Sequence, residues 1–93
     1  MPFIYHFSPK PMSSRQYDAC IDALVAAGAG SPAGRLYHVA YGSPDALRVF
    51  DVWDSNASFE KFGESLRPIL ERLGVDPGAP DVAPVHNIIL GDT

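Results

Sequence analysis

Two stretches of the chain carry apolar residues at the spacing of an α-helix. The first set consists of Tyr17, Cys20, Ile21, Leu24 and Val25, and the second consists of Phe59, Phe62, Leu66, Ile69, Leu70 and Leu73. Around these stretches lie short runs that are rich in aromatic and β-branched residues and are bounded by Gly and Pro. Such runs are typical of strands. They predict strands at residues 3–8, 34–41, 47–53 and 82–90.

The ends of both predicted helices carry recognisable signals. Ser13 and Gln16 have the spacing of a capping box at the start of the first helix. Residues 54–55 offer an N-cap for the second helix, and Gly74 marks its end. Pro68 lies inside this second helix and removes one backbone donor. We therefore expect the helix to kink or restart near Pro68.

The predicted order of strand, helix, strand, strand, helix and strand is the split βαβ arrangement of ferredoxin-like folds. We predict one α+β domain spanning residues 1–93, in which a four-stranded antiparallel sheet carries both helices on one face. Residues 43–46 are expected to close a hairpin between the second and third strands. Pro84 in the last strand suits a sheet edge, where its missing N–H is not needed.

Alternation along the predicted strands leaves apolar side chains on both faces of the sheet. In the first strand, Phe3, Tyr5 and Phe7 lie on the opposite face from Ile4. In the second, Tyr37, Val39 and Tyr41 lie opposite to Leu36 and Ala40. In the third, Phe50 and Val52 lie opposite to Leu47, Val49 and Trp53. Two helices can cover only one face, and the other face would be a larger apolar patch than a soluble monomer usually exposes. We therefore predict a homodimer in which the same face of a second copy covers it.

Composition and charge restrict the partners of the chain. A hydrophobic share of 46% and a charged share of 19% are typical of a globular domain. The net charge is −4 and no basic stripe is present, which argues against nucleic acid. No apolar run approaches the length of a membrane span, and residues 1–7 lack the features of a signal peptide. Because Cys20 is the single cysteine, we expect no internal disulfide and a cytoplasmic protein.

Histidines are the main candidates for chemistry, because His6, His38 and His86 all fall inside predicted strands. If the hairpin closes at residues 43–46, His38 pairs with Asp51 across the strand ladder. A carboxylate beside an imidazole fixes its tautomer and raises its basicity, as a general base requires. A register slip of one residue would place Asp51 beside Tyr37 instead. The candidate catalytic residues are therefore His38 and Asp51, with His6 as a further candidate.

The aromatic residues of the strands are candidates for binding a substrate. Tyr5, Tyr37, Tyr41 and Trp53 offer flat apolar surfaces with polar tips, and His86 is placed with them. Their alternative role is packing in the core or in the dimer interface. The histidines have a similar alternative as hydrogen-bonded structural residues. No histidine or cysteine spacing matches a known ligand pattern, so no metal site is predicted.

Residues 49–62 combine a strand that ends in Trp53, an N-cap and a helix that begins with aromatic side chains. Together with the element order, this motif resembles the dimeric α/β-barrel superfamily, especially its antibiotic biosynthesis monooxygenase-like branch. The resemblance implies a homodimeric barrel with a pocket in each subunit between the sheet and its helices. Well-known members oxidise polycyclic phenols without metal or flavin, whereas others bind haem, isomerise lactones or cyclise polyketides. Many of the monooxygenase-like proteins carry a His in the second helix, where this chain has Phe62 and Gly63.

Two classes of function fit these observations. The first is a small-molecule enzyme, a cofactor-independent monooxygenase that acts on an aromatic or polyketide-like substrate, with His38 held by Asp51 as its general base. The second is a non-catalytic homodimer that binds a ligand or has a structural role. Haem binding through one histidine is a third hypothesis, suggested by relatives of the same fold. The enzyme hypothesis needs no cofactor, and its partners are a second copy of the chain and a small hydrophobic or aromatic molecule.

Overall fold

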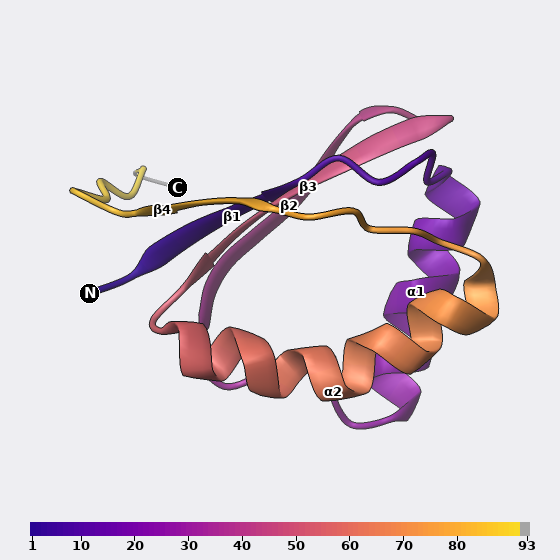
Figure 1. The fold of residues 1–93 in the computed structure, drawn as a ribbon, viewed down its shortest axis with the longest axis horizontal. Coiled ribbons are helices and arrows are strands. Elements are labelled where there is room, and N and C mark those ends of the chain that lie inside the picture. Colours follow the sequence, from indigo (N-terminus) through magenta and orange to yellow (C-terminus); the bar gives the residue numbers. More distant parts are fainter. Residues whose placement is uncertain (92–93) are drawn as a thin grey trace.

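The chain folds into four strands and two helices in the predicted order (Figure 1). The computed structural model describes residues 1–91. The elements are β1 (Phe3–Phe7), α1 (Ser14–Ala26), β2 (Arg35–Ser43), β3 (Ala46–Trp53), α2 (Asn56–Leu73) and β4 (Asp81–Pro84). Both helices lie on one side of the sheet, called here the inner face, so the predicted ferredoxin-like α+β fold is confirmed. Neither helix of the described residues is long and apolar enough to cross a membrane.

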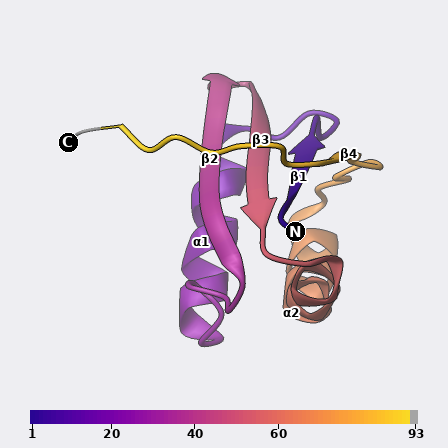
Figure 2. The same ribbon diagram turned by 90° about the vertical axis from the view of Figure 1, so that its left-hand side faces the viewer.

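The strands lie side by side in the order β2-β3-β1-β4, and all neighbours are antiparallel (Figure 2). The hairpin between β2 and β3 closes with Ser43 opposite Ala46. Counting back from this turn places His38 opposite Asp51, as the sequence predicts. Pro84 lies in the edge strand β4, where no neighbour requires its missing N–H.

The last strand is shorter than predicted. The sequence predicts it over residues 82–90, whereas β4 ends at Pro84. The N–H of Val85 still donates to the carbonyl of Pro2 at 2.9 Å, but β1 begins at Phe3 and offers no further strand partner beyond that point. Residues 86–91 continue as an extended segment that crosses in front of β3 and β2 in Figure 2. This segment lies on the side of the sheet that faces away from the helices. We call that side the outer face.

A β-bulge at the start of β2 changes which side chains face the helices. Arg35 and Tyr37 pair with two successive residues of β3, which leaves Leu36 as an extra residue. Strict alternation predicted that Leu36 and His38 share a face. This prediction was wrong, because one inserted residue reverses the alternation. Arg35 and His38 now share the inner face, and the side chain of Leu36 is 57% exposed.

Both helices begin at the predicted N-caps, and α2 ends at the predicted Gly74. The side chain of Ser13 accepts from the N–H of Gln16 at 3.1 Å, and the side chain of Gln16 accepts from the N–H of Ser13 at 3.0 Å. This reciprocal pair is the predicted capping box. At α2 the side chain of Ser55 accepts from the N–H of Ser58 at 3.2 Å, and Gly74 ends the helix in the left-handed conformation.

Helix α2 continues through Pro68 as one helix, so the predicted restart is not observed. Pro68 is exposed, whereas the next two residues, Ile69 and Leu70, are buried in the core. Packing of this apolar face holds the helix together across the one backbone hydrogen bond that proline removes.

The core is centred on Trp53 and Tyr5, the largest fully buried side chains. Phe59 of α2 stacks on Tyr5 with the ring centroids 4.1 Å apart and meets Trp53 edge-on at 5.9 Å. The hydroxyl of Tyr5 donates to Asn56 Oδ1 at 2.7 Å, which ties β1 to the first turn of α2. Asp51 is the only charged residue buried within residues 1–91, so this core contains one carboxylate that needs partners.

The approach of Gly34 to α2 generates a prediction about stability. Gly34 has φ of +90°, and a Cβ at this position would lie 2.4 Å from Ser58 Oγ and 2.6 Å from Asp54 Oδ1. We expect Gly34→Ala to lower the free energy of unfolding by roughly 3 kcal/mol, because backbone strain adds to a steric clash. Urea denaturation of the variant measures this loss.

Gly28→Ala is the matched control. Gly28 also has a positive φ, +75°, but nothing lies within 4 Å of the place that a Cβ would occupy. It should lose only about 1 kcal/mol, the cost of the left-handed backbone alone. Equal losses in the two variants would contradict the close approach of Gly34 to α2.

Candidate active site

A half-buried histidine and a buried aspartate from neighbouring strands form the centre of the site. His38 of β2 and Asp51 of β3 are partners in the ladder, and His38 Nδ1 lies 2.5 Å from Asp51 Oδ1. The indole N–H of Trp53 donates to the other oxygen, Asp51 Oδ2, at 3.3 Å. Asp51 is only 5% exposed. Two donors therefore compensate a carboxylate that the fold has removed from water.

Tyr17 of α1 completes a chain of hydrogen bonds. Its hydroxyl lies 2.6 Å from His38 Nε2, and the two rings are nearly parallel. A carboxylate can only accept, so Nδ1 of His38 must carry the proton that faces Asp51. Nε2 of the neutral ring is then the acceptor, and Tyr17 donates to it. The result is a continuous chain of hydrogen bonds from Tyr17 through His38 to Asp51.

The environment of Tyr17 keeps its hydroxyl protonated. Burial raises the pKa of Tyr17 above its ordinary value of 10.0, and the charge of Asp51 acts in the same direction. The positive charge of Arg35 opposes both and lowers the pKa, but it does not outweigh them. At neutral pH Tyr17 is therefore a hydroxyl that can donate to His38.

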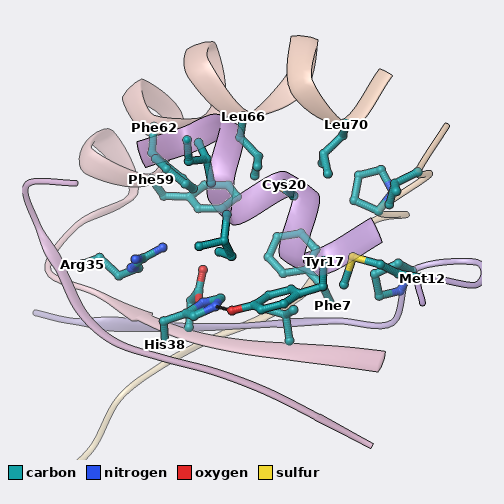
Figure 3. A pocket seen from close by; sticks show the side chains of 17 residues that line it. Phe7, Met12, Tyr17, Cys20, Arg35, His38, Phe59, Phe62, Leu66 and Leu70 are labelled. Carbon is teal, nitrogen blue, oxygen red and sulfur yellow. Dashed lines mark hydrogen bonds and ion pairs between the residues drawn. The ribbon is translucent and has the colours of Figure 1, made fainter. Parts of the chain in front are cut away.

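This chain opens into a cavity of about 80 Å³ between the sheet and the two helices (Figure 3). Phe59, Phe62, Leu66 and Leu70 of α2 line one side. Four polar side chains from the sheet and α1 also line the cavity. They are Tyr17, Arg35, His38 and Asp51. Proton-transfer groups thus lie against an otherwise apolar surface.

Cys20 also lines the cavity, from α1. It is a free, buried cysteine, and burial raises the pKa of its thiol above the ordinary value of 9.0. A thiol that resists ionisation is a poor nucleophile, so its role here is packing.

Arg35 enters the cavity because of the β-bulge. One of its guanidinium nitrogens donates to the carbonyl of Gly30 at 3.3 Å, and its Cζ lies 5.5 Å from the centroid of the Phe62 ring. Figure 3 shows the guanidinium directed into the cavity, on the same side as His38. Neither of the two ion pairs within residues 1–91 involves Arg35.

The structure separates the other candidate residues from this site. His6 and Tyr41 contact each other on the outer face. Tyr37 lines a groove on the same outer face, and His86 is exposed beyond β4. Tyr5 is in the core, where its hydroxyl is bonded to Asn56.

Of the candidates proposed from the sequence, the structure brings together His38, Asp51 and Trp53. Trp53 reaches the group through its bond to Asp51 and does not line the cavity. Sequence reasoning missed Tyr17 and Arg35. The signal for Tyr17 is present in the sequence, since it is the one hydroxyl-bearing residue on the apolar face of the first helix. Arg35 gives no such signal, because only the bulge turns it inward. Within the described residues, no three His, Cys, Asp or Glu side chains are grouped so as to hold a metal ion.

Two solved structures are similar to the chain along nearly its full length. SnoaB, a cofactor-independent oxygenase from Streptomyces nogalater, superposes with a TM-score of 0.60 at 13% identity, over 95% of this chain and 94% of that protein. A candidate antibiotic biosynthesis monooxygenase from Chloroflexus aurantiacus J-10-fl superposes with a TM-score of 0.57 at 26% identity, over 97% of each chain. No family model and no curated protein matches the sequence. The chain therefore has the ferredoxin-like fold of antibiotic biosynthesis monooxygenase family proteins, the group that its sequence resembles.

Proposed function

We propose that the protein is a small-molecule enzyme, a cofactor-independent monooxygenase that ionises a phenolic or enolic substrate by means of a histidine general base. The observation that carries this proposal is the chain of hydrogen bonds from Tyr17 through His38 to Asp51, which ends at an apolar cavity. A carboxylate behind an imidazole favours the protonated ring that a general base becomes. The apolar lining excludes water from the anion that forms.

In the proposed first step, the substrate gives the proton of its acidic O–H or C–H group to the oxygen of Tyr17. At the same time the hydroxyl proton of Tyr17 passes to His38 Nε2. His38 then carries both ring protons, and its positive charge faces the carboxylate of Asp51 at 2.5 Å. The substrate is left as an anion, and the total charge of the site with its substrate is unchanged.

In the proposed second step, the substrate anion reacts with dioxygen. Where the substrate carries an activated CH2 group, one oxygen atom becomes a new carbonyl oxygen and the other leaves as water with the two hydrogens. The carbon loses four electrons and dioxygen accepts four. No flavin, metal or external reductant is therefore required for the balance.

The similarity to SnoaB, described as a cofactor-independent oxygenase, supports this reaction class. The cavity sets a condition on the substrate. A cavity of about 80 Å³ is smaller than the ~150 Å³ that accommodates a benzene ring. A ring-sized substrate must therefore displace side chains as it enters. Met12 lines the cavity and is a flexible, unbranched side chain that can move in this way.

The small volume of the cavity also favours the competing function, a non-catalytic homodimer that binds a small ligand or has a structural role. In that case the bonds of His38 hold β2 against α1, and no proton leaves a substrate. The two functions differ in whether any substrate is consumed with dioxygen.

Oxygen uptake with a panel of one- to three-ring phenols that carry an activated CH2 group tests the proposed enzyme. We expect His38→Ala and Asp51→Asn each to lower kcat/KM by about a hundredfold to ten-thousandfold, because both remove the general base or its correct tautomer. Tyr17→Phe should cause a loss in the same range by breaking the relay to the substrate. An oxygen electrode records the rates.

The control is His86→Ala, since His86 is exposed and lies outside the cavity. It should retain the full rate. A full rate in His38→Ala would remove the histidine from the mechanism. If the wild-type protein takes up no oxygen with any member of the panel, the non-catalytic function is favoured instead.

We also propose that two copies of the chain pair through the outer face. Tyr37 and Leu36 are more than half exposed there, beside the apolar side chains of Ile4 and Phe50. The segment of residues 85–91 forms a groove with this face, and it carries further apolar side chains that are exposed: Ile88, Ile89 and Leu90. Covering this surface with a second copy would remove the apolar area from water at both partners.

Sedimentation equilibrium of Tyr37→Glu tests the proposed pairing. The wild-type protein should sediment at twice the chain mass, and Tyr37→Glu should raise the dissociation constant by at least ~100-fold, because each dimer would bury two carboxylates. Val25→Glu is the matched control on α1, since Val25 is 63% exposed and Tyr37 is 56% exposed. A monomeric wild type, or equal dimerisation of the two variants, would contradict the proposal.

A further inference from the structure

Arg35 is a cation at an apolar cavity, and no carboxylate of the described residues is paired with it. The guanidinium carries five N–H donors, of which the structure uses one, on the carbonyl of Gly30 at 3.3 Å. Phe62 faces it as a ring and accepts no conventional hydrogen bond. The Phe62 ring and the Gly30 carbonyl compensate this half-buried charge only in part, and an anion in the cavity would complete the compensation.

The position of Arg35 is fixed by the backbone around it. Gly34 accepts from the N–H of Asp54 at 2.8 Å and has no room for a side chain against Ser58. The bulge at Leu36 then turns Arg35 to the inner face. The fold therefore directs the Arg35 side chain to the wall of the cavity, where the Gly30 carbonyl and the Phe62 ring contact its guanidinium.

Arg35 lines the same cavity as the hydrogen-bonded chain of Tyr17, His38 and Asp51. Both Arg35 and His38 line the cavity, and Figure 3 shows them on the sheet side with Tyr17 close to His38. The charge of Arg35 also reaches the hydroxyl of Tyr17, since it lowers the pKa of that group against the effect of burial. An anion formed next to Tyr17 would experience the same attraction.

We propose that Arg35 is a catalytic residue that binds the anionic oxygen of the substrate, which is therefore a phenol or enol with an ionisable O–H. This inference rests on the proposed function, because it takes the cavity beside His38 as the substrate site. The proton leaves the substrate oxygen for Tyr17 and His38, and the negative charge that remains faces the guanidinium. No bond to carbon forms or breaks in this step, and no oxidant takes part.

Arg35 would distinguish an acidic phenol from a neutral aromatic molecule. The apolar side chains of α2 that line the cavity would contact the ring of either molecule equally. Only the ionised molecule gains charge-assisted hydrogen bonds from Arg35, which are about twice as strong as neutral ones. The site should therefore lower the pKa of a phenol that it binds.

4-Nitrophenol is the probe for this test, because its ionised form absorbs visible light and its neutral form does not. We expect the pKa of the bound probe to lie about one to three pH units below that of the free probe. In Arg35→Gln the shift should be lost, although glutamine can still donate to Gly30. In Arg35→Lys the charge is retained and part of the shift should remain.

Arg48→Met is the matched control, since Arg48 is an exposed arginine on β3 opposite Tyr41, on the outer face. It should leave the shift unchanged. The proposal is overturned if the wild-type protein does not bind the probe, if the bound probe titrates like the free probe, or if Arg35→Gln keeps the shift. Should Arg35→Gln fail to fold, the wild-type and Arg35→Lys titrations still decide, because both must show a lowered pKa.

The titration needs neither oxygen nor turnover, so its result is separate from that of the oxygen-uptake measurement. A retained shift without oxygen uptake would leave Arg35 as the anion-binding residue of a non-catalytic site. Oxygen uptake without the shift would overturn the role of Arg35 alone.

Discussion

The site is organised around the buried carboxylate of Asp51. A charge removed from water must be compensated, and its two oxygens accept from His38 and Trp53. This requirement favours the strand register that places His38 opposite Asp51. Hydrophobic alternation along the strands also restricts the register. It also selects the tautomer of His38 and so leaves Nε2 to Tyr17. The chemistry of the site follows from the way in which the fold satisfies one buried charge.

Most of the fold could be predicted because it depends on local patterns. Helical spacing, the capping box at Ser13 and the left-handed Gly74 are properties of short segments, and the structure confirms them. The hairpin register was also predictable, since the turn closes between Ser43 and Ala46. The bulge at Leu36 could not be predicted, because it depends on how β2 meets β3 and the start of α2. The end of β4 likewise depends on where its partner β1 begins.

The pair at the centre of the candidate site, His38 and Asp51, could be predicted, whereas the residues around it could not. The pairing of His38 with Asp51 follows from register alone. The aromatic residues were grouped by chemical type, but Tyr37 and Tyr41 lie on the outer face, away from the cavity. Conversely, Tyr17 reaches the site from a helix, and its contact with His38 requires the packing of α1 on the sheet. Such contacts between elements could not be predicted from the pattern of any single segment.

The proposed role of His38 as a base depends on which ring nitrogen carries its proton. Nitrogen NMR of the imidazole ring in the folded protein at neutral pH distinguishes a proton on Nδ1 from one on Nε2. We predict that Nδ1 carries the proton in the neutral ring and that Asp51→Asn abolishes this preference. A neutral ring protonated on Nε2 would contradict the account, because that nitrogen could not accept a proton from Tyr17 and the histidine could not act as the base.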